Sequence, residues 1–203
     1  MRRADQGALN WRHLRDLPQV TLYCRRSQWV AKREMRASAH FMRRAWDRLD
    51  LDAILTVEGK PAAYFKSVAR NDPEREAEYQ RLLWNQGVAN LLVVHDANHV
   101  RVYSAHATPS NQPIVGGDDE RLVESLNLTS FVLREFALRL ETGQYYRDHS
   151  PKFQAKASVD YLLLENLAAA SEKLSSGPAK LDRSTCHALL GRLLFVCYIS
   201  AHK

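Results

Sequence analysis

Four short apolar segments in the first half of the chain come in two pairs, and this arrangement constrains the fold more than any other feature. The first pair spans 52–57 and 62–68 around a Gly-Pro turn, and the second spans 90–95 and 100–105. Valine, leucine, tyrosine and phenylalanine dominate the four segments, which predicts two β-hairpins. A sheet built from such hairpins needs helices to cover its apolar faces.

The segment between the hairpins predicts a helix with defined ends. Asp72 is typical of an N-cap, Pro73 suits the first helical position, and the helix is expected to run to Gln86 and stop at Gly87. Upstream, residues 19–24 predict a short strand, and a helix is expected from Ser27 to about Leu49. The order of elements predicts an α/β fold with a mixed sheet flanked by helices.

The second half of the chain changes in composition. Residues 107–118 contain two prolines and two glycines and predict a linker. The leucine-rich remainder predicts helices near 119–141, 157–175 and 182–200. We therefore expect an α/β domain over 1–106 and a helical annex over 119–203.

Positive charge is concentrated at the N-terminal end. The first 49 residues hold 12 arginines and lysines against 4 acids, a net charge of +8, while the whole chain carries +6. The helix expected after Ser27 has an apolar face that includes Phe41, Met42 and Ala45, and a basic outer face. Arginine matches the geometry of phosphate, which favours binding to nucleic acid. The predicted DNA contacts are Arg25, Arg26, Lys32, Arg33, Arg36, Arg43 and Arg44.

The cysteines and the lack of long apolar runs indicate the cytoplasm. The chain has three widely spaced cysteines without a CxxC pair, no apolar run long enough to span a membrane and no signal-peptide pattern. Cys186 and Cys197 lie on one expected helix and are predicted to be buried core residues. His95 and His99 flank the second hairpin turn, where we expect them to be turn residues rather than metal ligands.

Asp52, at the start of one hairpin strand, and Tyr64-Phe65-Lys66, in the other strand, suggest a degenerate catalytic site. The order helix–hairpin–helix–strand resembles the restriction-endonuclease-like fold of PD-(D/E)xK nucleases. That family pairs such an aspartate with an acidic-x-Lys triplet to hold Mg²⁺ and activate water. Here tyrosine stands in place of the second acid. A literal triplet, Glu58-Gly59-Lys60, falls at the hairpin turn, where side chains point to solvent.

Several longer segments carry a second resemblance. They are Trp84–Val94 with its Trp-Asn-x-Gly helix end, Val100–Ser104, Val159–Leu167 and Leu189–Ile199. Together with the first hairpin they resemble the N-terminal region of bacterial N6-adenine DNA methyltransferases from restriction-modification and phage-defence systems. The family's S-adenosylmethionine loop and NPPY-type tetrad do not occur in this sequence. P-loops, dinucleotide fingerprints and GxSxG elbows are also absent.

Three hypotheses follow. In the first, the chain is a DNA-binding, catalytically inactive nuclease-like module, with no cofactor, that works with a methyltransferase domain or subunit. In the second, it is an active Mg²⁺-dependent endonuclease that uses Asp52 with Glu58 and Lys60, or with Lys66. In the third, it is a protein-interaction module, with a homodimer formed through 182–200. No contact with a membrane is expected.

Overall fold

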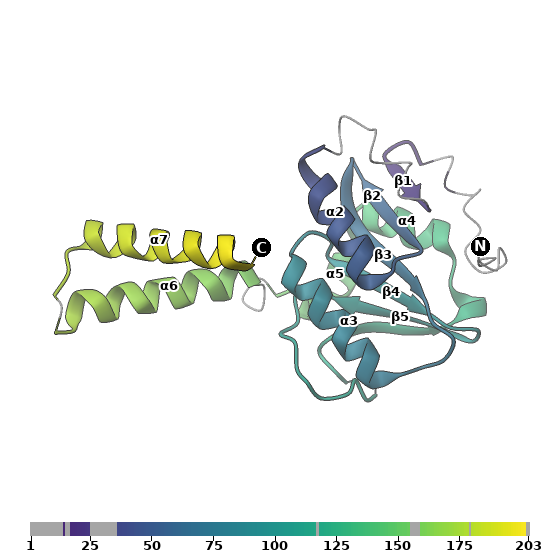
Figure 1. Cartoon of the computed structure of the whole chain (residues 1–203). Coiled ribbons are helices and arrows are strands. Elements are labelled where there is room, and N and C mark those ends of the chain that lie inside the picture. The colour runs from purple at the N-terminus through teal and green to yellow at the C-terminus, as the bar shows by residue number, and fades with distance from the viewer. Residues whose placement is uncertain are drawn as a thin grey trace. The chain divides into compact units, whose positions relative to one another are not determined.

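The computed structural model describes residues 14, 17–24, 36–116, 118–154, 159–178 and 180–201. The chain divides into two units, residues 1–159 and 160–203. The first unit contains a sheet with helices on both faces, and the second is a pair of helices (Figure 1).

Six strands form one mixed sheet, and their order in the sheet is their order in the chain. All neighbours are antiparallel except β3 and β4, which are parallel and are joined through helix α3 (Pro73–Gln86). Parallel neighbours need such a crossover because a tight turn reverses the chain. The strands are β1 (Val20–Tyr23), β2 (Ala53–Val57), β3 (Lys60–Ser67), β4 (Leu91–His95), β5 (His99–Ser104) and β6 (Leu122–Asn127).

Strand β4 shows how the sheet is buried on both faces. Leu92 and Val94 pack in the cluster formed with α2 (Arg36–Leu49) and α3, while Leu91 and Val93 pack in the opposite cluster. Helices α4 (Leu133–Glu141) and α5 (Gln144–Asp148) cover that second face (Figure 1). The short 3₁₀ helices η3 (Leu128–Ser130) and η4 (Ser150–Lys152) flank them. The predicted α/β class, a mixed sheet flanked by helices with further helices at the C-terminal end, is confirmed.

Local sequence signals account for the first hairpin and for the ends of α3. The Asp72 side chain accepts a hydrogen bond from the Arg75 backbone N–H at 3.2 Å, and Gly87 ends the helix with a φ of 59°. The hairpin turn has positive φ at both Glu58 (50°) and Gly59 (74°). Two such residues suit the right-handed twist of paired strands. Both hairpins, the strand near residue 20 and helix α3 were correctly predicted.

The helix predicted over 119–141 is wrong in its first part. Residues 122–127 form β6, which pairs with β5 along the edge of the sheet, and helix α4 begins only at Leu133. The segment Leu-Val-Glu-Ser-Leu-Asn contains good helix formers, so its local propensity favours a helix. Hydrogen bonding to the open edge of β5 outweighs that weak preference, as tertiary contacts commonly do.

The segment predicted as a linker, 107–118, packs within the first unit. The buried guanidinium of Arg121 donates to the carbonyls of Ser110, Gln112 and Pro113 at 3.0, 2.9 and 3.3 Å. Ile114 is buried in the cluster that includes α2 and α3. The division between units falls at 159/160, so this glycine- and proline-rich stretch belongs to the first unit.

Helix α2 is amphipathic, but its apolar face is narrower than predicted. Met42, Ala45 and Leu49 are buried against the sheet, whereas the side chain of Phe41 is 49% exposed. Phe41 was predicted to lie on the buried face, and that prediction is wrong. The expected N-cap Ser27 lies outside the described residues.

The second unit consists of α6 (Val159–Ser176) and α7 (Arg183–Ala201), which run side by side (Figure 1). Cys186 is buried, and its Sγ lies 3.3 Å from the Ser175 hydroxyl. Cys197 is exposed, so the prediction of a buried cysteine holds for Cys186 and is wrong for Cys197. In the part of the chain that the structure describes, no helix is both long and apolar enough to cross a membrane.

Candidate functional site

The edge of the sheet where β3 and β4 end brings together Asp52 and Lys66, two of the predicted catalytic residues. The two strands are parallel, so Ser67 at the end of β3 pairs with His95 at the end of β4. Strand β2 runs the other way and begins at the same edge, just after Asp52. In open α/β sheets, ligands bind outside the carboxyl ends of parallel strands. This edge is therefore the candidate site.

Asp52 is held at this edge by β3. Its Oδ2 accepts a hydrogen bond from the backbone N–H of Ser67 at 2.5 Å, and its own N–H donates to the Phe65 carbonyl at 2.9 Å. The residue is exposed. Burial lowers the pKa of the neighbouring His95, and the negative charges of Asp52 and Asp96 act in the opposite direction. Asp52 is thus an oriented, accessible carboxylate beside an imidazole.

Lys66 is buried on the side of the sheet that faces α2 and α3. Its Nζ donates to the backbone carbonyl of Asp50 at 3.0 Å and lies 3.6 Å from the Asp50 Oδ2. The same ammonium lies 5.2 Å from the centre of the Tyr79 ring, within cation–π range. The lysine is therefore engaged at the C-terminal end of α2, where a cation also interacts favourably with the helix dipole.

Tyr64 lies on the same side of β3, two residues before Lys66. Its side chain is fully buried, burial raises its pKa, and its hydroxyl has no hydrogen-bond partner among the described residues. Among the described residues no cluster of three histidines, cysteines or acids could hold a metal ion. A Mg²⁺ ion needs near-octahedral oxygen ligands, so these residues do not fit a Mg²⁺ site.

Glu58 and Lys60 lie away from this edge. They flank Gly59 at the β2–β3 turn, where Val57 pairs with Lys60 and both Glu58 and Lys60 are exposed. The whole of β2 separates Glu58 from Asp52, a distance of about 20 Å for six extended residues. The prediction that Asp52, Glu58 and Lys60 share one site is wrong, because a hairpin places its turn at the opposite end from the start of its first strand.

A buried ionic network lies beside the candidate site and was not predicted. Arg101 on β5 donates through Nε and Nη2 to the two carboxylate oxygens of Glu76 on α3, at 2.8 and 2.7 Å. Its Nη1 donates to the Asp96 Oδ2 at 2.9 Å, and the Tyr103 hydroxyl donates to Glu76. The sequence signal for this network was Arg101 between Val100 and Val102, because a charged residue within an apolar strand needs a buried partner of opposite charge.

This network positions the turn that follows β4. Asp96 accepts hydrogen bonds from the backbone N–H groups of Asn98 and His99 at 2.7 and 2.9 Å. Burial acts to raise the pKa of Asp96, but these bonds and Arg101 together hold it below its ordinary value. His99 Nδ1 lies 3.8 Å from Asp96. The Arg101 guanidinium and the carboxylates of Glu76 and Asp96 thus bind one another. We interpret the network as a structural support for this end of the sheet rather than as a ligand-binding group.

The basic residues predicted to contact DNA are only partly described. Four of them, Arg25, Arg26, Lys32 and Arg33, lie outside the described residues, and Arg36 begins α2 with a side chain that is not described. Of the rest, Arg43 is exposed and Arg44 is half-buried. Arg48, which was not among the predicted contacts, is exposed in the last turn of the same helix.

Comparison with protein-family models, with curated proteins and with solved structures gives no match. The functional proposal therefore depends on the residues at the β3–β4 edge and on the exposed side of α2.

Proposed function

We propose that this chain is a nucleic-acid-binding module with a nuclease-like sheet that has no metal site. The observation that carries the proposal is the β2–β3 hairpin, which brings Asp52 and Lys66 to one edge while Tyr64 occupies the position of the second acid. A carboxylate and a lysine at this edge fit the resemblance to PD-(D/E)xK nucleases. In this proposal the tyrosine and the engaged lysine leave the site unable to cleave DNA.

The basic side of α2 supports binding to the phosphate backbone. The helix contains four arginines and one aspartate, a net charge of +3, and its exposed side includes Arg43 and Arg48. Arginine binds phosphate with paired donors, and contacts to phosphate position a protein without reading the base sequence. In this proposal the chain acts in the cytoplasm, beside the methyltransferase domain or subunit of a restriction-modification system.

The test is binding to a short DNA duplex over a series of salt concentrations. About five phosphate contacts give a log–log slope of roughly −4 to −5. Replacing both Arg43 and Arg48 with alanine is expected to make the slope shallower by about 2. The matched control replaces Arg134 and Arg147, two exposed arginines of α4 and α5, and removes the same charge. Absence of binding at low salt, or equal losses in both variants, contradicts the proposal.

Cleavage decides between the inactive module and an active nuclease. We expect no cleavage of plasmid DNA with Mg²⁺ or Mn²⁺, because the described residues hold no cluster of three histidines, cysteines or acids that could bind the metal. Cleavage that requires metal and is lost in Asp52→Asn would replace this proposal with the endonuclease hypothesis. Asp52→Asn keeps the size of the side chain and an oxygen that accepts the hydrogen bond from Ser67, so we expect the variant to fold like the parent and to differ from it only in charge.

A further inference from the structure

The helices of the second unit expose an unusual amount of apolar surface. Among the described side chains of residues 160–203, only Cys186 is buried. Large apolar side chains are exposed on both helices, and they include Leu163, Leu164, Leu193, Leu194, Phe195 and Val196. In proteins, contiguous exposed apolar surface of this kind marks a site of association.

Helix α7 needs neighbours on more than one side. Leu193, Leu194, Phe195 and Val196 are consecutive, and they are 53, 39, 65 and 58% exposed. Four consecutive residues span a full helical turn, since an α-helix has 3.6 residues per turn. A helix that is apolar all round is typical of the interior of an assembly. Although α7 packs beside α6, the side chains all round this turn of α7 remain exposed.

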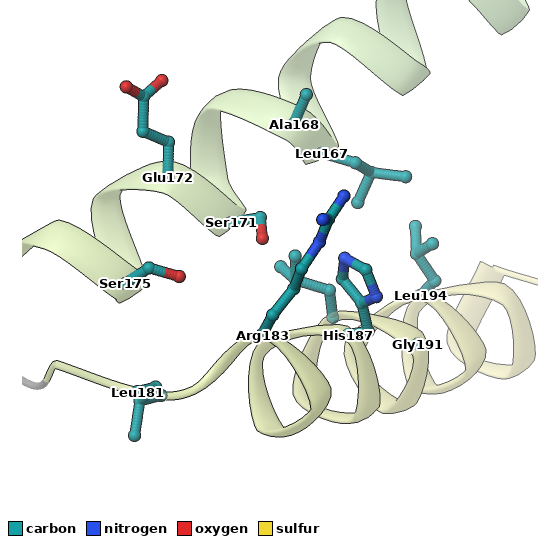
Figure 2. Close-up of a pocket in the computed structure, with 11 residues that line it drawn as sticks. Leu167, Ala168, Ser171, Glu172, Ser175, Leu181, Arg183, His187, Gly191 and Leu194 are labelled. Atoms are coloured by element: carbon teal, nitrogen blue, oxygen red, sulfur yellow. The ribbon is translucent and has the colours of Figure 1, made fainter.

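The two helices of the unit leave a groove between them that suits another helix. It has a volume of about 740 Å³. Its lining includes the small residues Ala168, Ser171 and Gly191, the leucines Leu167 and Leu194, and the polar residues Glu172, Arg183 and His187 (Figure 2). A side chain added at Gly191 would meet nothing within 4 Å. Small residues beside leucines form the holes into which the side chains of a neighbouring helix insert.

The charges of the two helices identify the occupant. Helix α6 carries Asp160, Glu165 and Glu172 against Lys173, a net charge of −2. Helix α7 carries Arg183 and Arg192 and no acid, a net charge of +2. A surface with one acidic and one basic helix is complementary to itself about a twofold axis parallel to the helices, because that axis places each helix beside the oppositely charged helix of the other copy.

We propose that a second copy of this chain covers α6 and α7, so that two hairpins form a four-helix bundle about a twofold axis. Each α6 then lies beside the α7 of the other copy, with the exposed leucines, Phe195 and Val196 in the bundle core. This association is independent of nucleic-acid binding by the first unit. It extends the sequence-based expectation of a homodimer through 182–200 by including α6 and by assigning the pairing of charges.

The test uses the full chain and the mass measured by sedimentation equilibrium. The parent chain is expected to be a dimer at micromolar concentrations. One variant combines Glu165→Lys with Glu172→Lys, and the other combines Arg183→Glu with Arg192→Glu. Each variant then carries like charges on both helices, and we expect its dimerisation to weaken by tenfold or more, on the order of the effect of several exposed ion pairs.

Mixing the two variants provides the decisive measurement. One hairpin is then basic and the other acidic, so the mixture is expected to form a 1:1 heterodimer at concentrations where each variant alone is a monomer. This recovery also shows that neither variant has simply failed to fold. Val132→Glu, at a residue 53% exposed in the first unit, is the control and is expected to leave the dimer intact.

Three results would overturn the proposal. They are a parent chain that is monomeric up to high concentration, variants that dimerise as strongly as the parent, and a mixture in which no heterodimer forms. If the chain is a monomer and its α7 amides are protected from hydrogen exchange, the first unit of the same chain would be what covers the helix.

Discussion

The Nζ of Lys66 on β3 donates to the backbone carbonyl of Asp50, 3.0 Å away, just after the last residue of α2. This bond joins the centre of the sheet to the end of the helix. Asp50 has a φ of 50°, a left-handed conformation that ends the helix and turns its carbonyl away from the helical hydrogen-bond pattern. The lysine that the sequence suggested for catalysis thus has a structural partner.

Replacement of Lys66 by methionine tests this role. The variant loses a charged donor to a part-buried carbonyl, and we expect the free energy of unfolding to fall by about 1.5–3 kcal/mol. Urea denaturation measures the loss. DNA affinity and its salt dependence should stay at parental values, and a large loss of affinity with unchanged stability would show instead that Lys66 contacts the ligand.

Arg101→Leu tests the ionic network beneath the candidate site. The substitution leaves the buried carboxylates of Glu76 and Asp96 without their shared cation, and we expect a loss of about 3–5 kcal/mol in unfolding free energy. Arg134→Ala removes an exposed arginine and is expected to leave stability unchanged. A loss in Arg101→Leu no larger than in that control would mean that the network contributes little.

Two buried tyrosines are expected to respond oppositely to loss of their hydroxyl groups. Tyr64→Phe removes a buried hydroxyl that has no partner among the described residues, so the unfolding free energy should rise by about 1 kcal/mol. Tyr103→Phe removes a hydrogen bond to the Glu76 carboxylate and should lower it by about 1.5–3 kcal/mol. Thermal and urea unfolding of the pair measure the difference, and changes of the same sign would contradict this assignment.

Glu58→Asn tests whether Glu58 is a turn residue. Asparagine tolerates positive φ far better than glutamate and is favoured before glycine in two-residue hairpin turns. With a φ of 50° at this position, we expect the substitution to raise the unfolding free energy by about 0.5–1 kcal/mol. DNA binding should not change. Lys60→Ala, at the exposed residue after the turn glycine, serves as the control.

The stability of the chain is expected to fall as the pH drops below about 6.5. Burial lowers the pKa of both His95 and His106 from the ordinary value of 6.5, so the folded state favours the neutral imidazoles. Their contribution is complete above pH 6.5 and is lost as the pH falls through the lower values of the folded state. Urea midpoints between pH 8 and 5 measure the loss.

Histidine variants locate the origin of this pH dependence. His106→Asn should remove part of the slope, and His40→Asn, at an exposed residue of α2, should leave it as in the parent. A parental midpoint that stays constant between pH 8 and 5 would show that the two histidines do not couple to folding in this way.

The order of elements was predictable where the signals are local. Asp72, Pro73 and Gly87 define α3 because capping and positive φ depend on a few adjacent residues. The two hairpins follow from short apolar segments around turns for the same reason. Residues 122–127 show the limit, since their own propensity favours a helix and only the open edge of β5 makes them a strand.

At the candidate site, too, some features were predictable from the sequence and others were not. The sequence alone determined that Asp52 directly precedes the first strand of the hairpin, that Lys66 lies on the second, and that α2 carries a net positive charge. Only the tertiary structure decided that Lys66 binds Asp50 and that Arg101 joins Glu76 to Asp96. These partners lie 16, 25 and 5 residues apart, and a buried charge selects its partner by proximity in the folded core, which no local pattern encodes.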